Sequence, residues 1–215
     1  MKTGFGIATA LVLIAAASVL GSLVAGAATD ADRWWHAVVS DLRSQPLVDV
    51  ALGLDQLGGG MIGVFIVPLG TGMTVLMVRG WRSALFAVAA FAASSLLVQI
   101  MKVLFGRVRP EDLLVAADFG SFPSGHTANA ATIAVVLSLL FPHFAVVLST
   151  GAWVLIMAFS RTVLAAHWLT DTLGGALLGV AAALLVAALM LAWAESDRPC
   201  IPRRIHCENR GHGDR

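Results

Sequence analysis

The sequence predicts an all-α fold: an integral membrane bundle of six transmembrane helices, with an interfacial helix between the first and second spans. Hydrophobic residues make up 58% of the 215 residues and charged residues only 13%, whereas about a quarter of the residues in soluble domains are charged. Charge-free stretches also recur, each near the roughly 20 apolar residues that cross a hydrocarbon core. The mean hydropathy of +0.85 agrees with this class. We therefore expect one membrane domain over residues 1–195, followed by a basic cytoplasmic tail over residues 196–215.

The spans follow in order from the apolar stretches. The first, at about residues 5–28, follows Lys2. The alternative is a signal peptide with Ala25-Gly26-Ala27 as its cleavage site, but the apolar run is longer than a usual signal core. The neutral stretch from Phe119 to Phe159 is too long for one span, and Pro142 divides it because proline ends a helix readily. The remaining spans are expected at about residues 59–78, 82–103, 126–141, 144–162 and 169–193.

The segment between the first two spans, residues 30–57, repeats apolar residues at roughly helical spacing among charged ones. We expect an amphipathic helix in the headgroup layer, held there by Trp34 and Trp35, which is either a platform beside the site or a plain linker. Gly58-Gly59-Gly60 marks a flexible join to the second span. In the last span, Gly175-Ala-Leu-Leu-Gly179 is a small-xxx-small pattern, which we interpret as close packing within the chain rather than dimerisation.

The distribution of charge predicts the orientation in the membrane, while the net charge of +1 gives no reason to expect a nucleic-acid partner. One side carries Lys2, Arg79, Arg82 and the tail arginines. Because basic residues gather on the cytoplasmic side, we expect a multi-pass protein of the inner (plasma) membrane with both termini in the cytoplasm. The acids on the extracytoplasmic side include Asp30, Asp32, Asp41, Asp49 and Asp55.

Tail residues Cys200 and Cys207 lack the C-x-x-C spacing of a zinc site and are expected to be free thiols.

Three polar clusters interrupt the apolar sequence, each at the end of a span. Taken singly, each has a plain structural explanation, because cations reach from span ends to the interface and short polar residues cap helices. Successive spans alternate in direction, however, so all three clusters fall on the extracytoplasmic side. Three cations, two histidines and a carboxylate there predict a site that binds a phosphate and cleaves its ester. The clusters are Lys102 to Arg109-Pro110, then Pro123-Ser124-Gly125-His126, then Ser160-Arg161 with His167 and Asp171.

The spacing within the clusters adds two expectations. His167 and Asp171 are four residues apart, so on one helix face the carboxylate can accept the imidazole N–H. The backbone N–H groups at the helix start beside Ser124 attract anions. Arg107 and the pair Glu111-Asp112 fall outside the motifs; they could tune the choice of headgroup, but we expect them in a solvated loop.

The strings K-x-x-x-x-x-x-R-P, P-S-G-H and S-R-x-x-x-x-x-H-x-x-x-D match, position for position, the three signature motifs of the type 2 phosphatidic acid phosphatase superfamily, which this chain resembles. The resemblance implies His167 as a nucleophile that forms a phosphohistidine, Asp171 as the residue that orients its ring, and His126 as the general acid. The family often has a tyrosine soon after the Ser-Arg pair, and its absence here leaves the substrate preference open. The resemblance also implies no metal or other cofactor, and phosphate-binding groups at Lys102, Arg109, Ser124, Gly125 and Arg161.

A site at the outer headgroup level suits a lipid whose tail stays in the bilayer while its phosphate enters the pocket. We expect metal-independent hydrolysis of a lipid phosphate or diphosphate monoester, with undecaprenyl diphosphate favoured over phosphatidylglycerol phosphate, phosphatidic acid and diacylglycerol diphosphate. The alternatives are a lipid phosphotransferase, which passes the phosphoryl group to an acceptor other than water, and a non-catalytic lipid-binding or transport protein. The expected partners are the lipid substrate and the bilayer.

Overall fold

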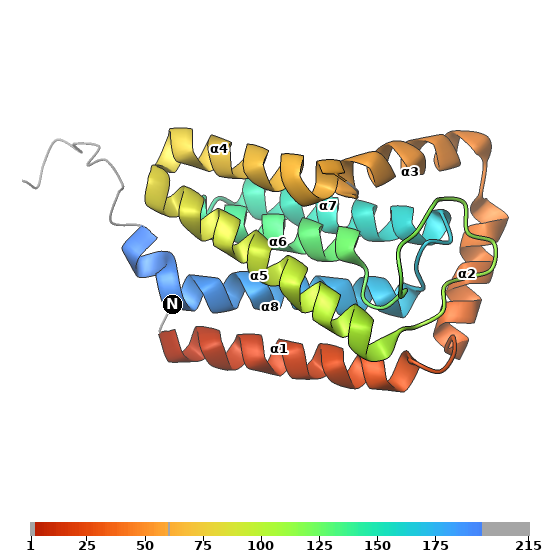
Figure 1. The fold of residues 1–215 in the computed structure, drawn as a ribbon. Coiled ribbons are helices and arrows are strands. Elements are labelled where there is room, and N and C mark those ends of the chain that lie inside the picture. The colour runs from red at the N-terminus through yellow and green to blue at the C-terminus, as the bar shows by residue number, and fades with distance from the viewer. Residues whose placement is uncertain (1–2, 60, 195–215) are drawn as a thin grey trace, which may run out of the picture.

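The computed structural model describes residues 3–59 and 61–194, and this part of the chain forms helices joined by loops (Figure 1). The predicted all-α class is confirmed. Lys2 and the tail, with its two cysteines, lie outside the described residues. The helices are α1 (Thr3–Val24), α2 (Asp30–Leu42), α3 (Gln45–Gly58), the π-helical η1 (Ile62–Ile66), α4 (Val67–Arg79), α5 (Trp81–Phe105), α6 (Gly125–Leu140), α7 (Phe144–Val163) and α8 (Leu169–Ala194).

Four of the described helices are long and apolar enough to cross a membrane. Their apolar segments are 20 to 25 residues long and have hydropathies between 1.6 and 2.4. The helices α4 and α6 are also apolar but shorter. The four long segments are Gly4–Val24, Trp81–Phe105, Phe144–Val163 and Leu169–Met190.

The second predicted span differs from a plain α-helix. It begins with the wider turns of η1, in which the N–H of Val67 bonds to the carbonyl of Ile62, and it continues as α4. Pro68 stands at the start of α4, and it lacks the N–H that a regular α-helix would bond four residues back. The wider turns immediately before Pro68 are consistent with this missing bond.

Residues 30–57 form two helices rather than the single one expected. Thr29 caps α2 with a reciprocal pair of hydrogen bonds to Asp32, which fixes the start of that helix. Pro46 stands in the first turn of α3, a position that suits proline because no N–H is needed there. Of the two tryptophans, only Trp34 is exposed, while Trp35 packs edge-on against Phe159 of α7. α2 thus runs across one end of the bundle, while α3 extends in line with α4 and packs beside the end of α7 (Figure 1).

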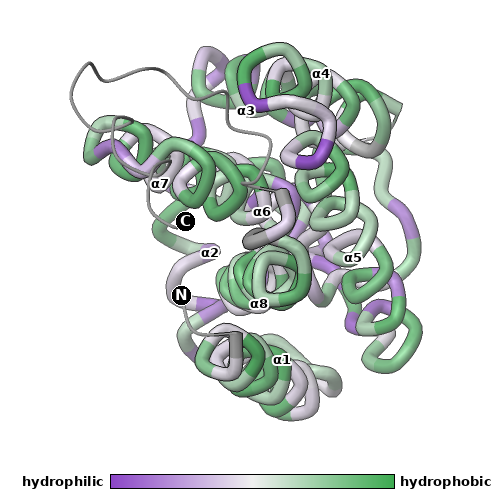
Figure 2. The backbone as a smooth tube through the Cα atoms, turned by 90° about the vertical axis from the view of Figure 1, so that its left-hand side faces the viewer, coloured by the Kyte–Doolittle hydropathy of each residue, from purple (hydrophilic) through white to green (hydrophobic). Residues whose placement is uncertain are grey.

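The helix α8 lies inside the bundle, with α1, α5, α6 and α7 around it (Figure 2). Two of its glycines allow a close approach to α6. A Cβ atom at Gly175 would lie 2.3 Å from the backbone oxygen of Ser124, and one at Gly179 would lie 2.2 Å from that of Ala128. The predicted close contact within the chain is therefore confirmed, and it holds the starts of α6 and α8 side by side.

A cluster of buried side chains fixes α2 and α3 against the end of α7. Val39 of α2 and Ala51 of α3 pack there with Val163 and Leu164. All four are nearly or fully inaccessible to solvent, and burial of apolar side chains of this size stabilises a fold by roughly 1 to 3 kcal/mol each. The helices α2 and α3 are therefore part of the packed core at this end of the bundle.

Candidate active site

Four helix ends meet at one end of the bundle and border a cavity of about 960 Å³. Lys102 lies in the last turn of α5, His126 in the first turn of α6, and Arg161 in the last turn of α7. His167 lies in the short turn before α8. The loop between α5 and α6 brings Arg109 across the same end (Figure 1). All five side chains line the cavity, as the alternation of span directions predicts.

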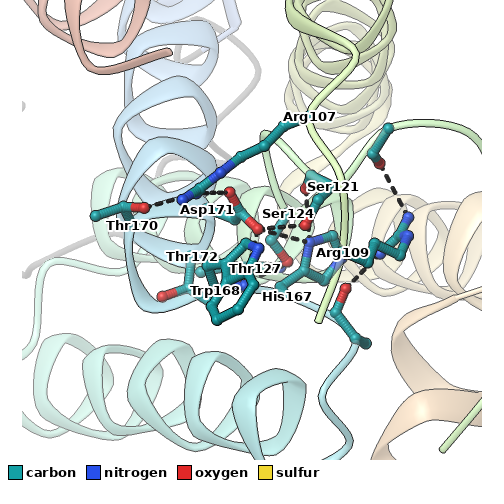
Figure 3. Close-up of polar contacts among 12 residues, drawn as sticks. Arg107, Arg109, Ser121, Ser124, Thr127, His167, Trp168, Thr170, Asp171 and Thr172 are labelled. Atoms are coloured by element: carbon teal, nitrogen blue, oxygen red, sulfur yellow. Dashed lines mark hydrogen bonds and ion pairs between the residues drawn. The ribbon is translucent and has the colours of Figure 1, made fainter. Parts of the chain in front are cut away.

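The ring of His167 is held with its Nδ1 atom 2.7 Å from the backbone oxygen of Ser121. A carbonyl oxygen only accepts hydrogen bonds, so Nδ1 carries the hydrogen and Nε2 keeps its lone pair. Nε2 lies 3.3 Å from Nη1 of Arg109 (Figure 3). Burial lowers the pKa of His167 to about 4. The imidazole is therefore neutral at physiological pH, with its unprotonated nitrogen beside a cation.

The prediction of a hydrogen bond between His167 and Asp171 is wrong. Nδ1 and Oδ2 are 3.7 Å apart, which is an ion-pair contact beyond hydrogen-bond distance. His167 precedes the first residue of α8, so the two residues do not share a helix face. The carboxylate instead accepts the N–H of Trp168 at 2.8 Å and the hydroxyl of Ser121. Since the carbonyl of Ser121 binds the imidazole, Ser121 connects Asp171 to the ring of His167 (Figure 3).

The expectation of a solvated loop is wrong for Arg107. Its side chain is buried, and its guanidinium joins Asp171 to Asp32 of α2, with Nη2 2.6 Å from the Asp32 carboxylate. Asp32 also accepts the backbone N–H of Thr170 at 2.9 Å. No signal in the motifs marks this residue, because Arg107 occupies a position that the string K-x-x-x-x-x-x-R-P leaves open.

Two of the site's cations share one carboxylate. Asp118, in the loop before α6, lies 3.0 Å from Nζ of Lys102 and 2.7 Å from Nη2 of Arg109. The carbonyl of Gly120 accepts further bonds from the same two side chains, at 2.9 and 3.0 Å. The loop is therefore tied to the end of α5 through these charges.

The third cation and the second histidine share Asp55, which lies in the last turns of α3. Nη1 of Arg161 is 2.6 Å from Oδ1 of Asp55. Nε2 of His126 is 3.1 Å from the backbone oxygen of Asp55 and 3.3 Å from Oδ1. His126 and Arg161 lower the pKa of Asp55 to about 2, although partial burial opposes this. The distribution of charge had placed Asp55 on the same side as the three clusters, but nothing in the motifs predicted its contacts with Arg161 and His126.

Ser124 and Gly125 lie at the start of α6, and they differ in access to the cavity. Ser124 caps the helix as predicted, with its hydroxyl oxygen near the N–H and the hydroxyl of Thr127 at 3.5 and 3.2 Å. It is fully buried, whereas Gly125 lines the cavity. Within the described ranges, no group of three or more His, Cys, Asp or Glu could hold a metal ion.

The fold and the site together define a helical membrane protein with a cationic, histidine-containing pocket at one end. The family model of the PAP2 superfamily matches residues 83–195, and the chain belongs to this superfamily. The resemblance inferred from the three motifs is therefore confirmed. The chain is accordingly a membrane protein and a phosphoric ester hydrolase.

The curated relatives carry phosphatase names. Phosphatidylglycerophosphatase B of Bacillus subtilis (strain 168) is 32% identical over 156 residues, which cover 67% of this chain and 76% of the relative. Lipid A 1-phosphatase of Rhizobium etli is 30% identical over 120 residues, half of each chain.

Two solved structures share the architecture. The crystal structure of a transmembrane PAP2 type phosphatidylglycerolphosphate phosphatase from Bacillus subtilis has a TM-score of 0.70 at 26% identity, and the match covers 84% of this chain and 95% of that one. The structure of LpxE from Aquifex aeolicus has a TM-score of 0.62 at 24% identity, covering 71% and 92% of the two chains. This second likeness concerns the fold alone.

Proposed function

We propose that this chain hydrolyses the phosphate monoester of a membrane lipid, through a phosphohistidine on His167 and without a metal ion. One observation carries the proposal: the cavity that holds both histidines and the three cations continues between apolar side chains. Ile62 and Phe65 of η1 and Phe91 and Val98 of α5 line this part of the cavity. A pocket that is charged at one end and apolar along its side suits a phosphate that is attached to a lipid.

The chemistry follows in two steps. In the first, the lone pair of Nε2 of His167 forms a bond to phosphorus while the bond from phosphorus to the ester oxygen breaks, and His126 gives a proton to that leaving oxygen. In the second, His126 takes a proton from water, the water oxygen bonds to phosphorus, and the bond from phosphorus to Nε2 breaks. Free phosphate and the lipid alcohol are released, and both histidines return to their starting state.

The cations supply the binding and the charge neutralisation on which phosphoryl transfer mainly depends. Nε and Nη2 of Arg161 are buried and have no hydrogen-bond partner among the described residues. Buried donors of this kind are costly unless they are paired, and a phosphate would accept from both in a bidentate contact. Lys102, Arg109 and the N–H of Gly125 would complete the contacts at the start of α6.

The arrangement in the membrane is proposed with six spans: α1, the continuous η1–α4 segment, α5, α6, α7 and α8. The site end carries most of the described acids, and the other end carries Arg79 at the end of α4 and Arg82 at the start of α5. By the positive-inside tendency, the site faces the extracytoplasmic side, and α2 and α3 lie in the headgroup layer of the inner (plasma) membrane. The short α6 fits this scheme because it starts at the cavity rather than at the membrane surface.

The names of the relatives favour a phospholipid monophosphate, with phosphatidylglycerol phosphate first, over the diphosphate carrier lipid that the sequence analysis preferred. A panel of four lipids tests this: phosphatidylglycerol phosphate, phosphatidic acid, diacylglycerol diphosphate and undecaprenyl diphosphate. The purified protein in detergent should release inorganic phosphate from phosphatidylglycerol phosphate with the highest kcat/KM, and it should do so in EDTA.

The His167→Ala variant is the matched control. It should release no phosphate above background, and wild-type turnover in this variant would refute the nucleophile. Release of one phosphate per lipid consumed, with no second lipid present, would exclude a phosphotransferase that requires another acceptor. A wild-type protein that releases no phosphate from any of the four lipids would refute the proposed function.

A further inference from the structure

Asp55 contacts two site residues at once, although it belongs to none of the three motifs. Its side chain binds Arg161 at 2.6 Å and lies 3.3 Å from Nε2 of His126, and its backbone oxygen lies 3.1 Å from the same nitrogen. The three side chains come from α3, α6 and α7, and all of them line the cavity. One residue of α3 thus contacts His126 of the second motif and Arg161 of the third.

The contact with the backbone of Asp55 assigns a role to each nitrogen of His126. The carbonyl oxygen only accepts, so Nε2 must carry a hydrogen in this arrangement. Nδ1 makes no hydrogen bond within the part of the chain that the structure describes. Nδ1 is therefore the nitrogen that remains to exchange a proton with the leaving group.

The end of α3 is shaped to the ring of His126. A Cβ atom at Gly58 would lie 2.6 Å from Cδ2, and one at Gly59 would lie 2.5 Å from both Cε1 and Nε2. At these distances one of the two groups must move, so a side chain at either position would displace the ring. The backbone of α3 thus covers the Nε2 edge of the imidazole and leaves little freedom for it to turn.

The position of Asp55 is itself well determined. Ala51, one turn earlier in α3, is buried in the cluster that joins α2 and α3 to the end of α7, and Leu52 packs against the same cluster. A functional side chain on a rigid, packed helix is held more accurately than one on a loop. Asp55 is therefore placed by the core of the protein.

We propose that Asp55 is a positioning residue for the leaving-group proton. It holds Nε2–H of His126 so that the protonated Nδ1 can give its proton to the leaving oxygen as the ester bond breaks and the bond from Nε2 of His167 to phosphorus forms. It also holds the guanidinium of Arg161 in place relative to Nδ1 of His126, so that the phosphate bound by Arg161 keeps a fixed position relative to the proton donor. The inference rests on the proposed function, because it specifies how the acid of that reaction is oriented.

The test compares leaving groups. An alkyl phosphate leaves as a strongly basic alkoxide and needs the proton, whereas 4-nitrophenyl phosphate leaves as a weakly basic phenolate and does not. We expect Asp55→Asn to lower kcat/KM for decyl phosphate by about 10²-fold and for 4-nitrophenyl phosphate by less than about 5-fold. The ratio kcat/KM reports only the steps up to formation of the phosphohistidine, so hydrolysis of that intermediate does not affect the comparison.

Three variants make the result decisive. Asp49→Asn, an exposed acid on the same helix that bonds only Gln45 among the described residues, should leave both substrates unchanged. Asp118→Asn, which removes a carboxylate from the pocket without touching His126, should change both substrates by the same factor. Gly59→Ala, which displaces the ring and keeps the carboxylate, should reproduce the selective loss on decyl phosphate, and it tests the proposal even if Asp55→Asn does not fold.

Equal losses on the two substrates in both Asp55→Asn and Gly59→Ala would overturn the proposal. So would a gain on both substrates in Asp55→Asn, which would make Asp55 a competitor of the phosphate. His126→Ala separates this proposal from the proposed function. If that variant also loses both substrates equally, the assignment of the general acid fails, whatever the role of Asp55.

Discussion

The contact between α6 and α8 offers the sharpest test of how packing sustains the site. At Gly175, a Cβ atom would lie 2.3 Å from the backbone oxygen of Ser124 and 3.3 Å from the backbone nitrogen of Ala128. Ordinary contact begins at 3.4 Å, so Gly175→Ala requires the two helices to separate by about 1 Å. Both atoms belong to the backbone, and no side-chain rotation can relieve the clash.

The separation would act directly on the reacting groups. The N–H of Ser124 bonds to the carbonyl of Asp171 at 3.0 Å, so the contact joins the turn that carries His126 to the one that carries His167. A displacement of about 1 Å in such a site costs on the order of 10²-fold in rate, and overpacking a helix contact costs roughly 1 to 3 kcal/mol of stability. We expect Gly175→Ala to lose about 10²-fold in kcat/KM for phosphate release and to unfold at a lower temperature in detergent.

The matched control is Gly151→Ala in α7, where a Cβ atom meets nothing within 4 Å. Alanine is favoured over glycine within a helix by roughly 0.5 to 1 kcal/mol, so this variant should keep full activity and unfold at the same or a higher temperature. If Gly175→Ala is as active as Gly151→Ala, the close approach of the two helices does not position the site, and the reasoning fails.

Three further predictions concern single residues. Since burial lowers the pKa of His167 to about 4, its Nε2 stays unprotonated down to that pH, and kcat/KM corrected for ionisation of the substrate should fall only near pH 4. An acid limb near pH 6.5 would contradict the buried, neutral nucleophile. Arg107→Ala leaves Asp32 and Asp171 without their shared cation, so thermal unfolding should show a loss of about 3 to 5 kcal/mol, with Arg107→Lys intermediate; an unchanged transition would show that the bridge is not structural. Ser124→Ala removes a helix cap worth about 1 kcal/mol and should reduce phosphate release without abolishing it, while complete inactivity would assign the hydroxyl to the phosphate.

The helices and the meeting of their ends could be predicted because they depend on robust properties of the sequence. Apolar length determines where a span can form, and alternation of direction determines which ends share a side. These two rules suffice to bring Lys102, His126 and Arg161 to one cavity. They also place the glycines of the last span in a helix contact, because small residues recur there at helical spacing.

The carboxylates that organise the site could not be predicted in the same way. Asp32 and Arg107 are 75 residues apart, and Asp55 and Arg161 are 106 apart. Periodicity carries no information on which charges pair across such separations, and the acids lie outside the motifs. The error at Asp171 has a related cause: a spacing of four residues implies a shared face only within a helix, and α8 begins after His167.

The carboxylate of Asp118 has a consequence for the turnover cycle. Because Lys102 and Arg109 already hold this anion at 3.0 and 2.7 Å, an arriving phosphate exchanges one set of ion pairs for another instead of neutralising bare cations. The free energy of binding is the difference between the two sets, so both the substrate and the released phosphate are held less tightly than three uncompensated cations would hold them. We expect the liberated inorganic phosphate to be a weak inhibitor, because Asp118 can form its ion pairs with Lys102 and Arg109 again as the phosphate leaves.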